Sequence, residues 1–338
     1  MILLLFPVHT FMIWNDFGNK FYVWGGGNRW ISTLIVLINP WFMPVLFAIA
    51  GVCARYSLEK RSPKEFVRER VRKLLLPFVS GMVLLVPIQT LFARKFFDGY
   101  EGGILENLAY FFTHVTDLSG YDGGFTPGHL WFLLFLFVIS LVALLVCRFL
   151  PYVKAADSVS KINFGLLMGL FVPVWLLYYI GNFGGFSLGK NFALYIIGYY
   201  VLSNDSVLER LERNFKWIAG IYGVSQLALA IAYHQWAFYG DLAVNFVGWS
   251  GVLFWFIAGK RWLNRETKGF NYFKNASFPI YILHQSILVA VGYYTLLLCD
   301  DLPLQMAVIL VGSFVLTVLC YQVIRHIPYL RCLLGIKA

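Results

Sequence analysis

The chain has 338 residues, of which 59% are hydrophobic and 13% are charged, whereas soluble domains are about 45–50% apolar and about 25% charged. The mean hydropathy of +0.70 excludes a water-soluble globular protein, because a chain of this length cannot hide so much apolar surface from water. The net charge of +10 does not require nucleic acid as a partner, because the cations gather in loops, as they do in membrane proteins.

The first apolar run, residues 1–14, is too short to cross a bilayer, which takes about 20 residues. It has no basic start and no small-residue cleavage site, so it is not typical of a signal peptide. The run ends in Trp14-Asn15-Asp16, a pattern typical of the membrane interface. We therefore expect it to be the outer part of a first helix that begins before Met1, so that the first span is truncated at its N-terminus.

Nine further apolar runs follow. Their expected limits are 31–54, 74–92, 129–147, 162–180, 191–203, 217–235, 243–259, 276–297 and 305–324. Together with the first run they predict an all-α, polytopic transmembrane helix bundle of about ten spans, forming one membrane-embedded domain over residues 1–338. The run 191–203 is the shortest, but without it every later basic loop would change sides.

Lysine and arginine are divided unevenly between the loops. Of the 27 cations, 22 lie in the alternate loops that include residues 55–73, and 5 lie in the others. Because cytoplasmic loops are enriched in Lys and Arg, we assign the basic set to the cytoplasm. Both ends of the complete chain then lie on the cytoplasmic side.

The densest basic segment runs from Phe66 to Pro77, directly into the second of the nine runs. Four cations occupy about two helical turns there: Arg68, Arg70, Arg72 and Lys73. They are either a plain positive anchor or a cytoplasmic pocket for a polyanion such as a nucleotide diphosphate or coenzyme A. Arginine suits phosphate because it can donate two hydrogen bonds to one phosphate group. No phosphate-binding glycine motif accompanies them.

Three of the six histidines lie within a predicted span or at its mouth: His9, His129 and His284. A neutral imidazole is tolerated in a helix bundle and suits acid–base chemistry near neutral pH. A packed, hydrogen-bonded residue is the alternative for each of them. Asp16 follows His9 by seven residues, nearly two turns, so we expect both on one helix face.

The remaining polar residues suggest no other chemistry. No carboxylate lies in the interior of a predicted span, which argues against an ion-coupled carrier. The five cysteines are scattered without metal-ligand spacing, so neither a metal site nor a disulfide framework is expected.

Several stretches together resemble, in order, the signatures of the acyltransferase-3 family of integral membrane acyltransferases. They are Val8-His9-Thr10, Asn39 to Gly51, Phe66 to Pro77, Gly128 to Leu133, and Ser277 to Gln285. The resemblance covers nearly the whole chain and is closest to the branch that includes glucan biosynthesis protein C. Lys73 stands where the family more often has arginine. The family's arginine, about eleven residues before the first-helix histidine, would precede Met1.

The resemblance implies transfer of an acyl group, acetyl or succinyl, from cytoplasmic acyl-CoA to a carbohydrate hydroxyl. Acetyl-CoA is the first candidate donor, and an extracytoplasmic or lipid-linked glucan of the cell envelope is the expected acceptor. The expected location is a bacterial inner membrane, with membrane lipid as a further partner. A polysaccharide or lipid transporter, or a structural subunit of an envelope complex, is the alternative. The oligomeric state is left open.

The resemblance also implies roles for individual residues. His9 is the expected general base, and the other catalytic candidates are His129 and His284. The phosphates of acyl-CoA are assigned to Arg68, Arg70, Arg72 and Lys73. The acceptor side is assigned to Asp16, Trp131 and Tyr281.

Overall fold

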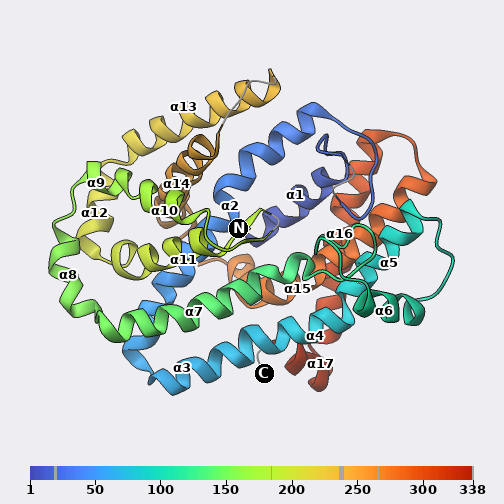
Figure 1. Cartoon of the computed structure of the whole chain (residues 1–338), viewed down its shortest axis with the longest axis horizontal. Helices are drawn as coiled ribbons and strands as arrows, with labels where there is room; N and C mark the ends of the chain where they lie inside the picture. The colour runs from blue at the N-terminus through green and yellow to red at the C-terminus, as the bar shows by residue number, and fades with distance from the viewer. Residues whose placement is uncertain (19–20, 184, 236–239, 265, 337–338) are drawn as a thin grey trace. The chain divides into compact units, whose positions relative to one another are not determined.

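The computed structural model describes residues 1–338 except 19–20, 184, 236–239, 265 and 337–338. Most of the described chain is helical (Figure 1). Apolar runs in lipid must satisfy their own backbone hydrogen bonds, and the α-helix does so within one segment. The strands among the described residues form a short antiparallel hairpin of β1 (Asn182–Phe183) and β2 (Phe186–Ser187), and turns and coil segments connect the helices. The predicted all-α membrane bundle is confirmed.

Seven helical stretches within the described residues are long and apolar enough to cross a membrane. They are Arg29–Lys60, Pro63–Phe97, Gly128–Phe149, Phe215–His234, Asp241–Leu263, Lys268–Leu298 and Leu302–Ile324. Each of them overlaps one of the predicted runs. Because these helices are long and apolar enough to span a bilayer, the chain is an integral membrane protein.

The other three predicted runs are helical but shorter than a full span. They form η1 and α1 (Ile2–Leu4 and Leu5–Met12), α9 and α10 (Phe164–Gly169 and Phe171–Leu177), and α11 and η4 (Leu188–Ile197 and Gly198–Leu202). The break between α9 and α10 lies just before Pro173, which has no N–H to donate and clashes with the carbonyl four residues earlier.

The chain divides into two compact units, each assembled from separate stretches. Unit 1 contains Met1–Ile35, Arg72–Leu134 and Glu266–Ala338, and unit 2 contains Val36–Val71 and Phe135–Arg265. Three helical stretches of the described chain include residues of both units: α2 (Arg29–Lys60), α7 (Trp131–Phe149) and the stretch Pro63–Phe97, which crosses at the π turn η2 (Val71–Leu75). A single domain over residues 1–338 stays a prediction.

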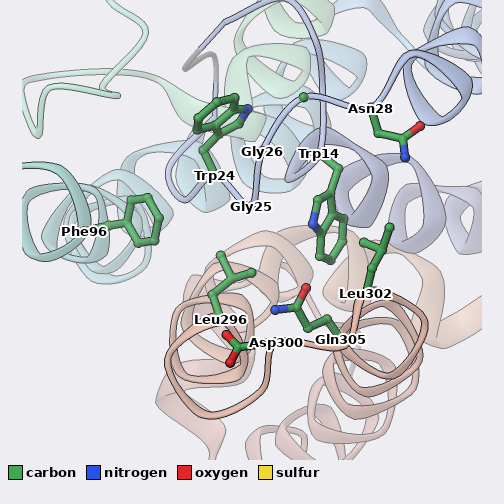
Figure 2. A pocket seen from close by; sticks show the side chains of 11 residues that line it. Trp14, Trp24, Gly25, Gly26, Asn28, Phe96, Leu296, Asp300, Leu302 and Gln305 are labelled. Carbon is green, nitrogen blue, oxygen red and sulfur yellow. The ribbon is translucent and has the colours of Figure 1, made fainter.

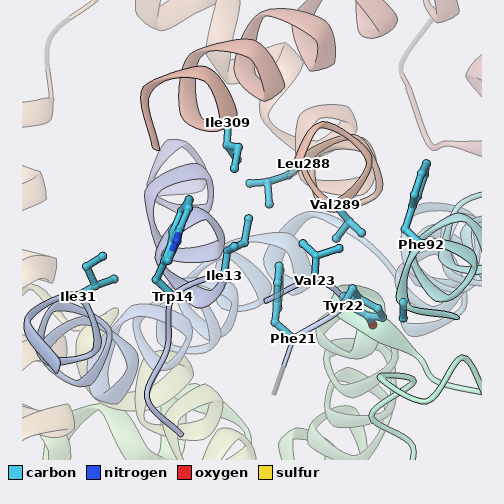
Figure 3. Packing of buried hydrophobic residues seen from close by; sticks show 11 residues of the cluster. Ile13, Trp14, Phe21, Tyr22, Val23, Ile31, Phe92, Leu288, Val289 and Ile309 are labelled. Carbon is cyan, nitrogen blue, oxygen red and sulfur yellow. The ribbon is translucent and has the colours of Figure 1, made fainter. Parts of the chain in front are cut away.

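Unit 1 is organised around α15 (Lys268–Leu298), which contacts α1, α5 and α16. Its other elements are η2 (Val71–Leu75), α4 (Leu76–Leu84), α5 (Val86–Phe97), α6 (Ile104–Thr113), η3 (Gly128–Leu130), α16 (Leu302–Ile324) and α17 (Pro328–Leu333). Figure 3 shows an apolar core at the end of α1, where Ile13 and Phe21 pack with Leu288 of α15 and Ile309 of α16. This core lies directly beyond His9 along the chain.

Unit 2 contains most of α2 and α7 together with a second group of helices. These are α3 (Pro63–Arg70), α8 (Tyr152–Ser160), α9, α10, α11, η4, α12 (Asp205–Arg213), α13 (Phe215–His234), α14 (Asp241–Ala258) and η5 (Gly259–Leu263). Two glycines let α2 and the α11–η4 helix meet backbone to backbone. A Cβ at Gly51 would lie 2.0 Å from the Tyr195 carbonyl oxygen, and one at Gly198 would lie 2.1 Å from that of Ala48.

We expect Gly51→Ala to destabilise unit 2, because the added methyl group has no room and overpacking typically costs about 1–3 kcal/mol. The measurement is the thermal unfolding midpoint of the purified protein in detergent. Gly220→Ala in α13 is the matched control, since nothing lies within 4 Å of its new methyl group. Equal midpoints for the two variants would contradict the close approach at Gly51.

Candidate active site

The three histidines predicted from the sequence come together in unit 1. His9 lies on α1, His129 lies in η3 at the start of α7, and His284 lies near the middle of α15. The ring centres of His9 and His284 are 5.2 Å apart, and those of His129 and His284 are 5.1 Å apart. His284 is thus the shared neighbour of the other two imidazoles.

His284 is completely buried and presents a lone pair inside the bundle. Its Nδ1 lies 2.6 Å from the backbone oxygen of Tyr281, and a carbonyl only accepts, so we assign the proton to Nδ1. In the neutral ring the lone pair is then on Nε2. This nitrogen is buried and has no hydrogen-bond partner among the described residues. It is therefore available to accept a hydrogen bond or a proton.

His129 is fixed in the opposite tautomer. Its Nε2 lies 2.8 Å from the backbone oxygen of Ile282, so we assign the proton to Nε2. Its Nδ1 then accepts from the side-chain amide of Gln89, whose nitrogen is 3.1 Å away. Both nitrogens of His129 are occupied. The ring is consequently held rigidly and has no lone pair left for a substrate.

The amide of Gln89 on α5 organises a buried polar network around His129. Its nitrogen also donates to the hydroxyl of Ser286 at 2.9 Å, and its oxygen accepts from the amide of Gln285 at 3.0 Å. Ser286 in turn donates to the backbone oxygen of Leu85 at 2.9 Å. Sequence reasoning did not single out Gln89 or Ser286. The sequence feature that could have identified Gln89 is its position as a polar amide inside the apolar run 74–92.

His9 is half-buried, unlike the other two imidazoles. Its ring stacks on Phe21, with the centres 6.0 Å apart and the planes 16° apart. Its Nδ1 is buried and has no hydrogen-bond partner in the described part of the chain, as is also true of the Thr10 hydroxyl. An N–H···N bond of about 2.9 Å between two imidazoles places their centres about 5 Å apart. The centres of His9 and His284 are 5.2 Å apart, but neither His9 Nδ1 nor His284 Nε2 forms a hydrogen bond with a described residue.

The predicted acceptor-side residues are placed differently from one another. Tyr281 lies at the imidazoles, where its hydroxyl donates to the backbone oxygen of His129 at 2.5 Å. Trp131 begins α7 and packs against Phe132, whose ring contacts that of Tyr281 at 5.9 Å. The carboxylate of Asp16 pairs with Arg29 at 2.8 Å.

The expectation that Asp16 and His9 share a helix face is wrong. Helix α1 ends at Met12, so helical periodicity does not extend to Asp16. The role of Asp16 toward an acceptor stays a prediction. In the part of the chain that the structure describes, no group of three or more His, Cys, Asp or Glu side chains is arranged to hold a metal ion.

Tyr22 is a buried residue near this site that sequence reasoning missed. A Cβ on Gly128 would lie 3.5 Å from both the Tyr22 hydroxyl and the Gln89 side-chain oxygen, so both groups approach the turn before His129. Burial raises the pKa of Tyr22, and the neighbouring Tyr121 adds to the shift. The Tyr22 hydroxyl therefore stays neutral, and it donates to the backbone oxygen of Ser119.

The four predicted phosphate-binding residues lie where α3 continues into a π-helical turn. Arg68 and Arg70 end α3, and the π turn η2 contains Arg72 and Lys73. Arg70 is half-buried, with its guanidinium 4.5 Å above the ring of Phe66, whereas the other three cations are exposed. Such turns occur frequently at functional sites.

The π turn and the imidazoles lie at different depths of unit 1. Gln89, which contacts His129, follows Lys73 by 16 residues along α4 and α5, or about 24 Å of helix. The hydrocarbon core of a bilayer is about 30 Å thick. The imidazole network is thus well separated from Arg72 and Lys73 along this helical stretch.

Comparison with known protein families gives one match. The sequence model of a family described as an acyltransferase domain matches residues 1–322 of the chain. The matched part contains the three imidazoles, the Gln89 network and the basic π turn. Comparisons with curated proteins and with solved structures found no match.

Proposed function

Because the chain belongs to the acyltransferase-3 family, we propose that it is a membrane O-acyltransferase of the glucan biosynthesis protein C-like branch. It moves an acetyl or succinyl group from cytoplasmic acyl-CoA, with acetyl-CoA as the first candidate, to a hydroxyl of an extracytoplasmic or lipid-linked carbohydrate. The observation that carries this proposal is the pair of unpartnered imidazole nitrogens on His9 and His284, whose ring centres are 5.2 Å apart. General-base catalysis needs such a nitrogen.

In the proposed reaction His9 acts as the general base. It is the half-buried member of the three, so it is the imidazole that a substrate hydroxyl can reach. His9 takes the hydroxyl proton while the oxygen attacks the thioester carbonyl. The tetrahedral intermediate then expels the thiolate of coenzyme A, which receives the proton from His9. The acyl group ends as an ester on the sugar, and both imidazoles return to their starting state.

The neighbouring groups support this base. When His9 is protonated, the unpartnered Nε2 lone pair of His284 can accept a hydrogen bond from it, while the Nδ1–H of His284 remains on the Tyr281 carbonyl. Positive charge on His9 is thereby stabilised in a site of low dielectric. The fixed Nε2–H tautomer of His129 keeps the turn that carries it in place against α15. Tyr281 strengthens the same connection through its hydroxyl.

We propose further that Arg68, Arg70, Arg72 and Lys73 bind the phosphates of the donor. The excess of Lys and Arg in the same set of loops supports a cytoplasmic location for these residues, and the membrane we propose is a bacterial inner membrane. Arginine suits this role because its planar fork donates two parallel hydrogen bonds to a phosphate. The exposed side chain of Arg72 is the simplest of the four to test.

Arg72→Ala should weaken acetyl-CoA binding by about tenfold to a hundredfold, because a hydrogen bond to a charged group contributes about 1.5–3 kcal/mol. The turnover number at saturating donor should stay close to that of the wild type. Equilibrium binding and steady-state kinetics of the purified protein measure the two quantities. Arg148→Ala, an exposed cation at the end of α7, is the control. Unchanged affinity in Arg72→Ala would remove this residue from the donor site.

The decisive experiment separates an enzyme from a transporter. Purified protein is incubated with acetyl-CoA labelled in the acetyl group and with a neutral oligosaccharide, and the sugar is then examined by mass spectrometry. An acyltransferase leaves the label on the sugar as an ester. If proteoliposomes instead move the oligosaccharide across the bilayer and no label is transferred, the transporter is correct and the proposal fails.

A further inference from the structure

A cavity of about 450 Å³ lies in unit 1 where α15 ends and α16 begins (Figure 2). Trp14 and Trp24 project into it from the segment after α1, and Asp300 and Gln305 project from the junction of the two helices opposite. Its volume is in the range of small-molecule sites, about 300–1,000 Å³. None of its lining residues belongs to the imidazole and amide network described above.

The cavity is close to the imidazoles but separated from them by the apolar core. Trp14 follows His9 by five residues along the chain, just after the end of α1 at Met12. Phe21 of the core stacks on His9, while Trp14 of the same core lines the cavity. A ligand in the cavity therefore lies on the far side of this apolar core from the proposed base.

The wall beside the tryptophans is built from backbone. Gly26 has φ +102°, a conformation that strongly favours glycine, and a Cβ at Gly25 would lie 2.4 Å from the indole nitrogen of Trp14. Trp24 is held by a hydrogen bond from its indole nitrogen to the backbone oxygen of Asn15. The cavity thus presents an indole ring that is already fixed in position.

The polar groups around the indoles include both donors and acceptors. Asp300 is exposed and forms no ion pair or hydrogen bond with a described residue. Asn28 uses its side-chain oxygen to accept from the backbone of Trp30 and Ile31, so its amide hydrogens remain available. Gln305 donates to the backbone oxygen of Cys299, and its side-chain oxygen remains available.

This combination selects one class of ligand. A phosphate would be repelled by Asp300, and a quaternary ammonium group would leave the amide hydrogens of Asn28 unused. A neutral sugar offers hydroxyls that both donate and accept, together with a face of C–H groups that packs on an indole. We infer that the cavity binds a neutral saccharide unit of the acceptor, next to the unit that is acylated. Only the identification of this saccharide as part of the acyl acceptor rests on the proposed function.

The test is equilibrium binding of a neutral glucose tetrasaccharide to the full-length protein in nanodiscs, without acyl-CoA. The wild type should bind, and Trp24→Ala and Asp300→Asn should each raise the dissociation constant by about tenfold or more. Asp300→Asn changes one exposed group, so it keeps the test valid if Trp24→Ala fails to fold. Trp30→Ala and Glu101→Gln, which remove an exposed indole and an exposed carboxylate outside the cavity, should leave binding unchanged.

The same protein is titrated with choline and with inorganic phosphate. Binding of choline or phosphate that is lost in Asp300→Asn, without saccharide binding, would overturn the inference, as would the absence of all binding. The outcome is distinguishable from failure of the proposed function. Saccharide binding without acyl transfer would contradict the proposed acyltransferase function and support the saccharide site in the cavity. Acyl transfer that is unaffected by Trp24→Ala and Asp300→Asn would support the function and contradict the saccharide site.

Discussion

Replacing His9 by alanine should lower the rate of acyl transfer by about 10²–10⁴-fold, which is the usual contribution of a positioned general base. The affinity for acetyl-CoA should stay close to that of the wild type, because the donor phosphates are proposed to bind at the distant π turn. Single-turnover transfer and equilibrium binding, measured on the same preparation, give the two numbers. Wild-type turnover in the variant would end the assignment of His9 as base.

Two further variants separate chemistry from packing at this position. His9→Asn retains a polar side chain on the stacked Phe21 but does not titrate, so it should be nearly as inactive as the alanine variant. His326→Ala removes an exposed imidazole at the end of α16 and should have no effect. If only His9→Ala were inactive and His9→Asn were normal, the residue would be a packing element.

His284→Ala should show the same direction of change, because it removes the nitrogen proposed to accept from His9. Residues that act as one unit give effects that are not additive. The double variant of His9 and His284 is therefore expected to be about as slow as His9→Ala alone. Independent, multiplying effects on the rate would indicate that the two imidazoles serve different steps.

The helices of this protein could be predicted from the sequence because their cause is local. An apolar run in lipid bonds its own backbone, so the composition of the run is enough to predict a helix. The lengths were less predictable, since they depend on single residues. Pro173 interrupts the run 162–180, and the run 191–203 ends in the π turn η4 rather than in a regular helix.

The imidazole cluster could be predicted only as a set of candidates. Short signatures around His9, His129 and His284 identify the residues, but their spacing of about 5 Å depends on how α1, η3 and α15 pack. The bond between Gln89 and Ser286 joins residues that are 197 positions apart, so no local pattern contains it. For Asp16 the periodicity argument was wrong because the helix ends before that residue.

Exchanging Gln89 for leucine should reduce the turnover number by about tenfold to a hundredfold. The change leaves Nδ1 of His129 and the amide of Gln285 without their buried partner, and each such loss costs about 1–3 kcal/mol. A loss of 1.36 kcal/mol in the transition state corresponds to tenfold in rate. The KM for acetyl-CoA should stay unchanged, which separates a positioning residue from a donor-binding one. Gln226→Leu removes a half-buried, bonded amide of unit 2 and is the matched control for stability.

The proposed route from Gln89 to the chemistry runs through His129, and a double-mutant cycle tests it. His129→Phe removes the ring nitrogens that Gln89 and Ile282 hold, so Gln89→Leu should have little further effect in that background. The expected coupling is comparable to the whole effect of Gln89→Leu in the wild type. If Gln89→Leu lowers the turnover number equally in both backgrounds, the amide acts through Ser286 instead. The tautomer of His129 would then have no part in the reaction.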